Sequence, residues 1–289
     1  MSTTSMESDL FLMSPPGAGF RLRGRANFRS AVAPDVDAAR ARQEWELLRA
    51  AIEDCGGRVR VLPPDDALTG LPFAAEAGQP AAGIGAGSPP RFLVPRMASA
   101  HRRGEAALWS AFVTQLGFDV VTLGEGVWEA QGDVAEFRGT TLLFYGGRTD
   151  YAGLRAARAH LGGVLLEIEI RDPAFHGNMA LLPLPAVDRV LVCPEVIVEP
   201  GMQLLAQRFG AERLIPVAES EIRQYATNGL PIGDSWIVPS VVPARVLRLV
   251  GELGMRVRSI VMSELCEKAG GASRCLVCRV PADIARGLA

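Results

Sequence analysis

A glycine-rich stretch near the C-terminus carries a residue that could act as a nucleophile. The stretch reads Lys268-Ala-Gly-Gly-Ala-Ser-Arg-Cys275 and runs into the apolar segment Leu276-Val-Cys-Arg-Val280. Glycines permit backbone turns that a side chain would forbid, and they let a substrate approach closely. We expect Cys275 at the junction of this loop with a strand, where it is held rigidly and can still be reached. Taken alone, the stretch favours a simpler interpretation, a buried small hydrophobe in a strand.

The three histidines narrow the choice of a partner for Cys275. His160 lies within a predicted amphipathic helix and His101 opens another, so we interpret both as surface or capping residues. His176 lies in an irregular loop, where residues serve function more often than packing. A cysteine beside a histidine can become a thiolate, the reactive form, at neutral pH. His176 is therefore the candidate acid/base.

The other cysteines have simpler interpretations. Cys278 completes a redox-like C-x-x-C spacing, but a strand points the two side chains to opposite faces. A zinc site made from Cys266, Cys275 and Cys278 lacks a paired second half. Cys55 and Cys193 have apolar neighbours and suit the core, and five cysteines in a chain this long argue against a disulfide framework. We expect no metal and no organic cofactor.

Composition excludes several classes of protein. The chain has 289 residues, of which 48% are hydrophobic and 21% charged, enough to bury a substantial core. A net charge of −2 and a pI near 6.0 give no basic footprint for nucleic acid or an anionic membrane. Without a spanning segment or a signal-like N-terminus, we expect a soluble cytoplasmic protein. The oligomeric state stays open, with a homodimer as one option.

One unit recurs five times along the chain. Each copy has a helical apolar pattern, a glycine where a left-handed cap belongs, and a β-rich run. The predicted helices cover residues 45–55, 108–116, 154–161, 202–209 and 246–253, and the strands cover 58–62, 118–121, 164–170, 213–216 and 255–261. The glycines recur every ~45–60 residues, a period typical of repeat architectures. The first fifteen residues offer few apolar anchors, and we expect them to be mobile.

Alternating helices and strands fit either a doubly wound sheet or a closed ring. The helix–glycine–strand order never varies, and each copy is followed by an irregular loop and a further apolar run, which favours the ring. We therefore predict an α/β fold, a five-unit pseudo-symmetric propeller, as a single catalytic domain over residues 1–289. In a radial assembly, equivalent loops converge on one axis.

The five loops carry polar residues at corresponding places. These residues are Glu76, Glu129 with Asp133, His176, Asn228 or Asp234, and Cys275. Chance scatter would not put polar residues in register with the repeat, so a central active site is predicted. Three carboxylates in one pocket would favour a planar cation rich in donors, such as a guanidinium. Cys275 would attack its carbon, and His176 would protonate the departing amine before activating water or a second amine.

The loops resemble those of the pentein family, the amidinotransferase, arginine-deiminase and dimethylarginine-dimethylaminohydrolase-like enzymes that modify guanidines. The matching segments are 12–16, 25–28, 71–78, 128–133, 147–149, 175–184 and 270–276, in the family's order. The resemblance implies a five-unit α/β propeller. It also implies that Cys275 is the nucleophile, His176 the general acid/base and Glu129 its carboxylate partner. Arg148 falls where several relatives bind a substrate carboxylate, and Asp133 fits a structural role as well as a catalytic one.

Two positions depart from the family pattern. Arginine-handling relatives usually have aspartate two residues after the histidine, where this chain has Asn178. Glu76 stands where aspartate or asparagine is common. Exchanging a carboxylate for a carboxamide removes a charged hydrogen bond worth about 1.5–3 kcal/mol. The substrate is therefore expected to be a guanidino compound, or a less cationic ureido or amidine compound, that need not be free arginine.

Three hypotheses follow. The first is a cysteine-dependent hydrolase that cleaves a C–N bond of a guanidino compound through a covalent amidino-cysteine intermediate. The second is an amidinotransferase, in which an amine replaces water. The third is a non-catalytic pentein that binds a partner, although a binding protein has no need of Cys275, His176 and Glu129 together.

Overall fold

The computed structural model describes residues 8–25, 27–85, 87–286 and 288. The strands are β1 Leu10–Met13, β2 Arg58–Val61, β3 Gln79–Ala81, β4 Arg91–Leu93, β5 Asp119–Val121, β6 Val134–Phe137, β7 Thr140–Tyr145, β8 Val164–Glu169, β9 Leu181–Leu184, β10 Arg189–Val192, β11 Leu214–Pro216, β12 Leu230–Ile232, β13 Ser235–Pro239, β14 Arg256–Ile260 and β15 Cys278–Val280. The α-helices are α1 Ala38–Asp54, α2 Glu105–Gln115, α3 Tyr151–Arg158, α4 Gly177–Ala180, α5 Gly201–Phe209, α6 Glu219–Ile222, α7 Ala244–Glu252 and α8 Ala282–Ala285.

The strands form five three-stranded sheets of one design. Their orders are β15-β1-β2, β3-β4-β5, β6-β7-β8, β9-β10-β11 and β12-β13-β14. In every sheet the first two strands are antiparallel and the last two are parallel. The parallel connection passes through a helix, as a crossover between parallel strands requires. The predicted five-unit α/β propeller is confirmed.

The two ends of the chain close the ring. β1 pairs antiparallel with β15, with Leu10 opposite Val280, and parallel with β2. All four residues of β1 are buried, so the expectation of mobility is wrong for this segment. The short run Leu10–Met13 is entirely apolar and becomes the middle strand of its sheet. The part of that expectation that concerns residues 1–7 lies outside the described residues.

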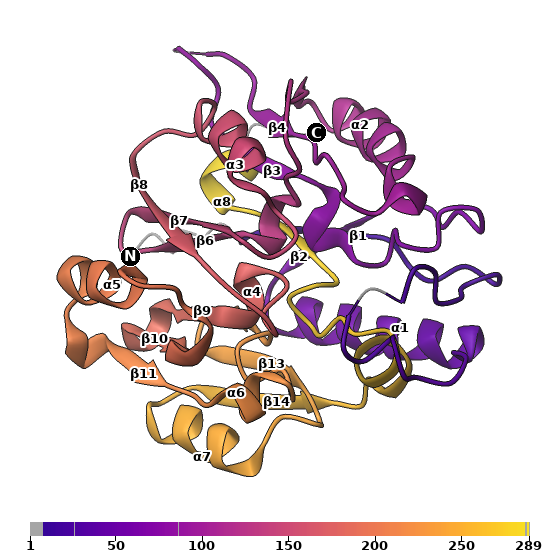
Figure 1. Cartoon of the computed structure of the whole chain (residues 1–289). Coiled ribbons are helices and arrows are strands. Elements are labelled where there is room, and N and C mark those ends of the chain that lie inside the picture. Colours follow the sequence, from indigo (N-terminus) through magenta and orange to yellow (C-terminus); the bar gives the residue numbers. More distant parts are fainter. Residues whose placement is uncertain (1–7, 26, 86, 287, 289) are drawn as a thin grey trace, which may run out of the picture.

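The helix–glycine–strand repeat appears as the sequence predicts. Gly56, Gly117, Gly163, Gly210 and Gly254 have φ values of 86°, 101°, 81°, 88° and 105°. Each lies between a helix and the parallel outer strand that follows, in the left-handed region that favours glycine. Figure 1 shows the five long helices α1, α2, α3, α5 and α7 around the periphery, with the sheets inside them.

Each outer helix buries one stripe of side chains. In α1 the buried side chains include Trp45, Leu48 and Ile52, which follow helical spacing. The inner strands β3 and β9 are buried along their whole length. Among the described helices, none is long and apolar enough to cross a membrane.

Candidate active site

Cys275 lies in a turn that two neighbouring loops hold in place. Its backbone N–H donates to the carbonyl of Ala272 at 2.9 Å, and its carbonyl accepts from Ala75 N–H at 3.0 Å. The Arg274 N–H donates to the carbonyl of Asn228 at 3.0 Å. The predicted strand start at Cys275 is wrong, because strand pairing begins only at Cys278. The turn is tied across the axis to two other units, which fixes the position of the sulfur.

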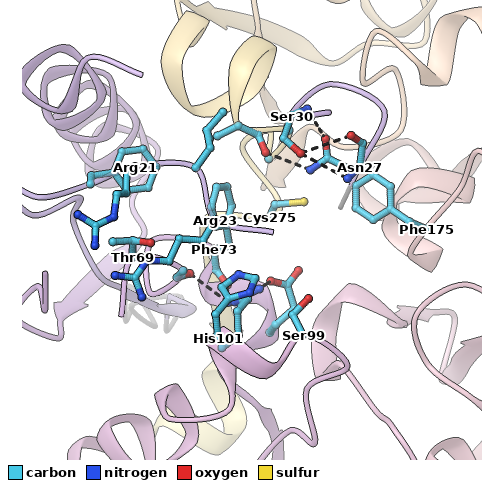
Figure 2. A pocket seen from close by; sticks show the side chains of 18 of the residues that line it. Arg21, Arg23, Asn27, Ser30, Thr69, Phe73, Ser99, His101, Phe175 and Cys275 are labelled. Atoms are coloured by element: carbon cyan, nitrogen blue, oxygen red, sulfur yellow. Dashed lines mark hydrogen bonds and ion pairs between the residues drawn. The ribbon is translucent and has the colours of Figure 1, made fainter. Parts of the chain in front are cut away.

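A pocket opens above the sulfur. Its lining includes Cys275, Glu76, Phe73, Asn27, Phe175, Arg148, His101 and Arg102. Figure 2 shows Cys275 between Phe73 on one side and Asn27 with Phe175 on the other, with His101 and Ser99 across the opening. The side chain of Cys275 is buried, with 3% of its surface exposed. A ligand in this pocket therefore meets the sulfur at the bottom.

His176 forms a fully buried pair with Glu129. The distance from His176 Nε2 to Glu129 Oε2 is 2.7 Å, and both side chains have no exposed surface. Burial disfavours the charge on His176, but Asp133, Glu129 and Glu76 outweigh it and raise the pKa of the imidazole. Burial likewise opposes the Glu129 charge, yet the hydrogen bond and the charge of His176 lower its pKa to about 2. The hydrogen bond and the opposite charges therefore favour the ionised form of each group.

The loops bring the histidine and its partner together through close backbone packing. Gly132 passes directly against the imidazole, so an added Cβ would lie 3.0 Å from the ring of His176. Asp133 accepts hydrogen bonds from the Thr149 hydroxyl and from the Gly177 N–H, both at 2.7 Å. Burial raises the pKa of Asp133 to about 6, although the charge of His176 and these hydrogen bonds oppose the rise. Its contacts join the Glu129 loop to the His176 loop.

Two asparagines surround the sulfur. Asn178 Nδ2 lies 3.5 Å from Cys275 Sγ, and Asn228 Nδ2 donates to the Asn178 carbonyl at 3.2 Å. The Oδ1 atoms of both side chains are buried without a hydrogen-bond partner in the described part of the chain. Burial and the charge of Glu76 raise the pKa of Cys275 to about 12, although hydrogen bonds from the two asparagines and the charge of Arg274 lower it. The resting site therefore holds a thiol, whereas the sequence suggested a thiolate.

Glu76 has a cationic partner that the sequence did not indicate. Arg102 is buried and forms ion pairs with Glu76 and with Glu105, the latter at 2.6 Å. It also donates to the carbonyl of Gly70 at 3.0 Å. On its other side, Glu76 Oε1 lies 3.4 Å from His176 Nδ1. Glu76 thus links the histidine pair to the pocket.

The rim of the pocket is basic. Arg148 Nη1 lies 3.6 Å from Glu129 Oε2, and its guanidinium lies over the Phe175 ring at 4.8 Å. Burial and the charges of Arg102, Arg23 and Arg148 lower the pKa of His101. His101, which the sequence suggested to be a surface or capping residue, is partly buried and lines the pocket. A ligand with an acidic group at this rim would relieve the repulsion between the cations.

The predicted site residues thus lie on one connected set of contacts. Glu129, His176 and Glu76 form a chain of charged groups, and Asn178, two residues after His176, contacts Cys275. Sequence reasoning missed Arg102, the paired role of Asn228 and the place of His101. Arg102 lies next to His101 in a segment that read as the start of a surface helix. Its spacing of three residues from Glu105 was the one available hint of an ion pair.

The sequence is similar to those of several known proteins. No family model matches the chain. It is 26% identical to the uncharacterized protein ZK1307.1 of Caenorhabditis elegans over 251 residues, 85% of each chain. It is 25% identical to the bifunctional arginine dihydrolase/ornithine cyclodeaminase ArgZ of Synechocystis over 249 residues, which are 85% of this chain and 34% of ArgZ. The dimethylarginine dimethylaminohydrolase of Mycobacterium tuberculosis is 24% identical over 265 residues, 92% of this chain and 83% of that protein.

Solved structures agree on the fold. The N-terminal domain of ArgZ covalently bound to a reaction intermediate superposes with a TM-score of 0.85 at 23% identity, covering 95% of this chain and 98% of that domain. A dimethylarginine dimethylaminohydrolase adduct with S-methyl-L-thiocitrulline gives a TM-score of 0.73 at 20% identity, covering 94% and 100%. The chain therefore has the pentein fold, and the resemblance predicted from the sequence is confirmed. The matched region of this chain covers only 34% of the full length of ArgZ.

Proposed function

We propose that this chain is a single catalytic domain that hydrolyses a C–N bond of a guanidino compound through an amidino-cysteine intermediate. The observation that carries the proposal is the pair of asparagine side chains beside Cys275 Sγ. Two carboxamide oxygens, Oδ1 of Asn178 and of Asn228, are buried there with no donor among the described residues. An unsatisfied buried acceptor costs about 1–3 kcal/mol. A guanidinium, with its several N–H donors, would satisfy both.

The substrate's charge would also activate the nucleophile. With its pKa raised to about 12, the Cys275 thiol is not ionised at neutral pH. A cation beside the sulfur favours the thiolate, so binding of the guanidinium would lower that pKa. The reactive form would then arise only with substrate in place, which protects the site from unproductive alkylation and oxidation.

The first chemical step forms a bond from Cys275 Sγ to the guanidinium carbon and breaks one of its C–N bonds. The thiol proton ends on the departing amine, relayed by His176. Glu129 accepts from His176 Nε2, so Nδ1 is the ring atom left to exchange protons on the side of Glu76. In the second step His176 takes a proton from water, and the hydroxide attacks the amidino carbon. The ureido product leaves as the C–S bond breaks, and His176 returns its proton to the sulfur to restore the thiol. The remaining water proton ends on the released amine.

The rim favours a substrate that is also an acid. Arg148 lies over Phe175 at the pocket wall, and Arg23 lies near His101 in the same lining. Guanidinium groups of this kind bind carboxylates with paired hydrogen bonds. We infer that the guanidino group enters toward Cys275 while the acidic end stays at the rim with Arg148. The relatives support this class, because ArgZ carries the name of an arginine dihydrolase.

Product analysis by mass spectrometry tests the proposal. The protein is incubated with a panel of guanidino acids, with and without primary amines, and Cys275→Ala serves as the blank. The proposal expects ureido products that need only water and vanish in the variant. Products that form only when an amine is present would show an amidinotransferase instead. Identical traces for the wild type and the variant across the panel would refute guanidine chemistry.

Trapping the intermediate gives a second, independent measurement. Acid quenching during turnover is expected to leave, on the peptide that contains Cys275, a mass increase equal to the substrate minus the departing amine. The matched control is Cys266→Ala, which removes a different buried cysteine and should leave the adduct in place. An adduct on another cysteine would contradict the assignment of Cys275 as the nucleophile.

A further inference from the structure

A second cavity, here called the axial cavity, is lined by residues that follow the active-site loops in the sequence. Its volume is about 440 Å³, within the range of small-molecule sites. Its walls come from all five units, through Gln79, Val134, Leu182, Leu230 and Val277. Each of these residues follows an active-site loop by a few positions. The axial cavity therefore lies on the same central axis as the pocket over Cys275, beyond the loops that carry the sulfur.

Gln79 presents an unsatisfied acceptor in this wall. Its side chain is buried, with 5% of its surface exposed, and its Nε2 donates to the carbonyl of Pro80 at 2.9 Å. Its Oε1 is buried and has no hydrogen-bond partner in the part of the chain that the structure describes. Buried polar atoms are normally paired, so a lone carboxamide oxygen in a cavity wall indicates a missing donor.

Arg274 presents a cation to the same space. Its Nη1 donates to the carbonyl of Leu181 at 2.7 Å, and no carboxylate among the described residues forms an ion pair with it. Burial lowers its pKa to about 10, which shows how poorly its charge is compensated. Asp9 also lines the cavity, but it already binds Arg279 at 2.6 Å and the Ala282 N–H at 3.0 Å. An anionic group from a ligand would supply the missing charge.

The remaining wall is apolar. Val134, Ala135, Leu182, Leu230 and Val277 contribute aliphatic surface. At the mouth, Glu136 and Ala186 are exposed. The cavity thus combines an aliphatic wall with a cation that has no carboxylate partner and an acceptor that has no donor among the described residues. Each of these features would contact a different part of a ligand.

We propose that the axial cavity binds a small α-amino acid with an apolar side chain. Arg274 binds its carboxylate, and the ammonium donates to Gln79 Oε1. Its side chain packs against Leu182, Leu230 and Val277. This site is separate from the guanidino pocket, and its occupation does not depend on the proposed hydrolase activity.

One consequence does rest on the proposed function. Arg274 immediately precedes Cys275, and its backbone N–H holds the turn to Asn228. A carboxylate on Arg274 cancels a positive charge beside the nucleophile, which disfavours the thiolate. Occupation of the axial cavity is therefore expected to slow turnover without blocking substrate binding.

Isothermal titration of the full chain with L-leucine, L-valine and L-methionine tests the site directly. L-Leucinamide, which lacks the carboxylate, and N-acetyl-L-leucine, which lacks the ammonium, are the ligand controls. Loss of one charge-assisted hydrogen bond weakens binding by about tenfold or more. Arg274→Gln and Gln79→Leu should each weaken binding by that factor. Arg42→Gln, on the outer face of α1, is the matched arginine control and should bind like the wild type.

Ala186→Trp keeps the test decisive if the buried variants fold poorly. Ala186 is exposed at the mouth, so a tryptophan there should fill the entrance and abolish binding while circular dichroism stays unchanged. Loss of binding in this variant, together with weaker binding of L-leucinamide and N-acetyl-L-leucine to the wild type, supports the proposal. Three results would overturn it: no heat with any of the three amino acids in the millimolar range, unchanged binding in Ala186→Trp, or equal binding of L-leucinamide. A catalytically silent protein that still binds L-leucine would refute the proposed function alone.

Discussion

Replacing Glu129 with glutamine separates the charge of the buried pair from its shape. Glutamine keeps the side-chain volume and an oxygen for the Ala98 N–H, which donates to Glu129 Oε1 at 3.0 Å. The fall in the pKa of Glu129 from 4.5 to about 2 corresponds to roughly 3 kcal/mol in favour of its ionised form in the fold. Because Glu129 has no exposed surface, solvent does not screen this interaction away. We expect Glu129→Gln to lose about that much stability near neutral pH, in line with broken buried pairs.

The directions of the two pKa shifts determine how the free energy of unfolding varies with pH. The lowered pKa of Glu129 contributes stability above 4.5, and this is lost as the pH falls through 4.5 toward 2. The raised pKa of His176 contributes stability that is complete below 6.5 and is lost as the pH rises through the folded-state value. The stability difference between the wild type and Glu129→Gln should therefore be largest between about pH 4.5 and 6.5, and decline on either side.

Urea unfolding followed by tryptophan fluorescence at closely spaced pH values measures this difference. Trp128 precedes Glu129 and reports on the same loop. Glu53→Gln, which breaks the exposed pair with Arg49, is the matched control and should cost at most about 1 kcal/mol. A loss in Glu129→Gln that is the same at about pH 5.5 and at about pH 3 would refute the reasoning, because it would arise from packing and not from charge.

Three further predictions concern the pocket. With its thiol pKa near 12, Cys275 should react with iodoacetamide far more slowly at pH 7–9 than free cysteine, as followed by mass spectrometry; rapid alkylation at pH 7 would contradict this. Arg102→Met strands two buried carboxylates and should destabilise the fold by about 3–5 kcal/mol in urea unfolding. The exposed neighbour, as Arg103→Met, should change little, and equal losses would argue against the ion pairs. Asn178→Asp restores the carboxylate of arginine-handling relatives and should raise kcat/KM for arginine by about tenfold, measured as citrulline release; no gain would remove Asn178 from substrate selection.

The sequence by itself determined the repeating unit. Apolar residues at helical spacing, capping glycines and apolar strands are local sequence patterns. Gly56, Gly117 and Gly254 take the left-handed conformations expected of them. The register of polar residues with that repeat was enough to predict that Cys275, His176 and Glu129 share one axis. Five copies of one local pattern also indicated the ring, because equivalent elements make equivalent contacts.

Only the tertiary structure decided which charges meet. The ion pairs of Arg102 with Glu76 and Glu105 depend on a segment that reads as a surface helix until the ring is assembled. The pairing of β1 with β15 joins segments far apart in the sequence, so the apolar run Leu10–Met13 did not indicate the sheet that buries it. The pKa of Cys275 depends on burial and on groups from three other units. Such properties arise from distances between residues far apart in the sequence, and local patterns do not contain those distances.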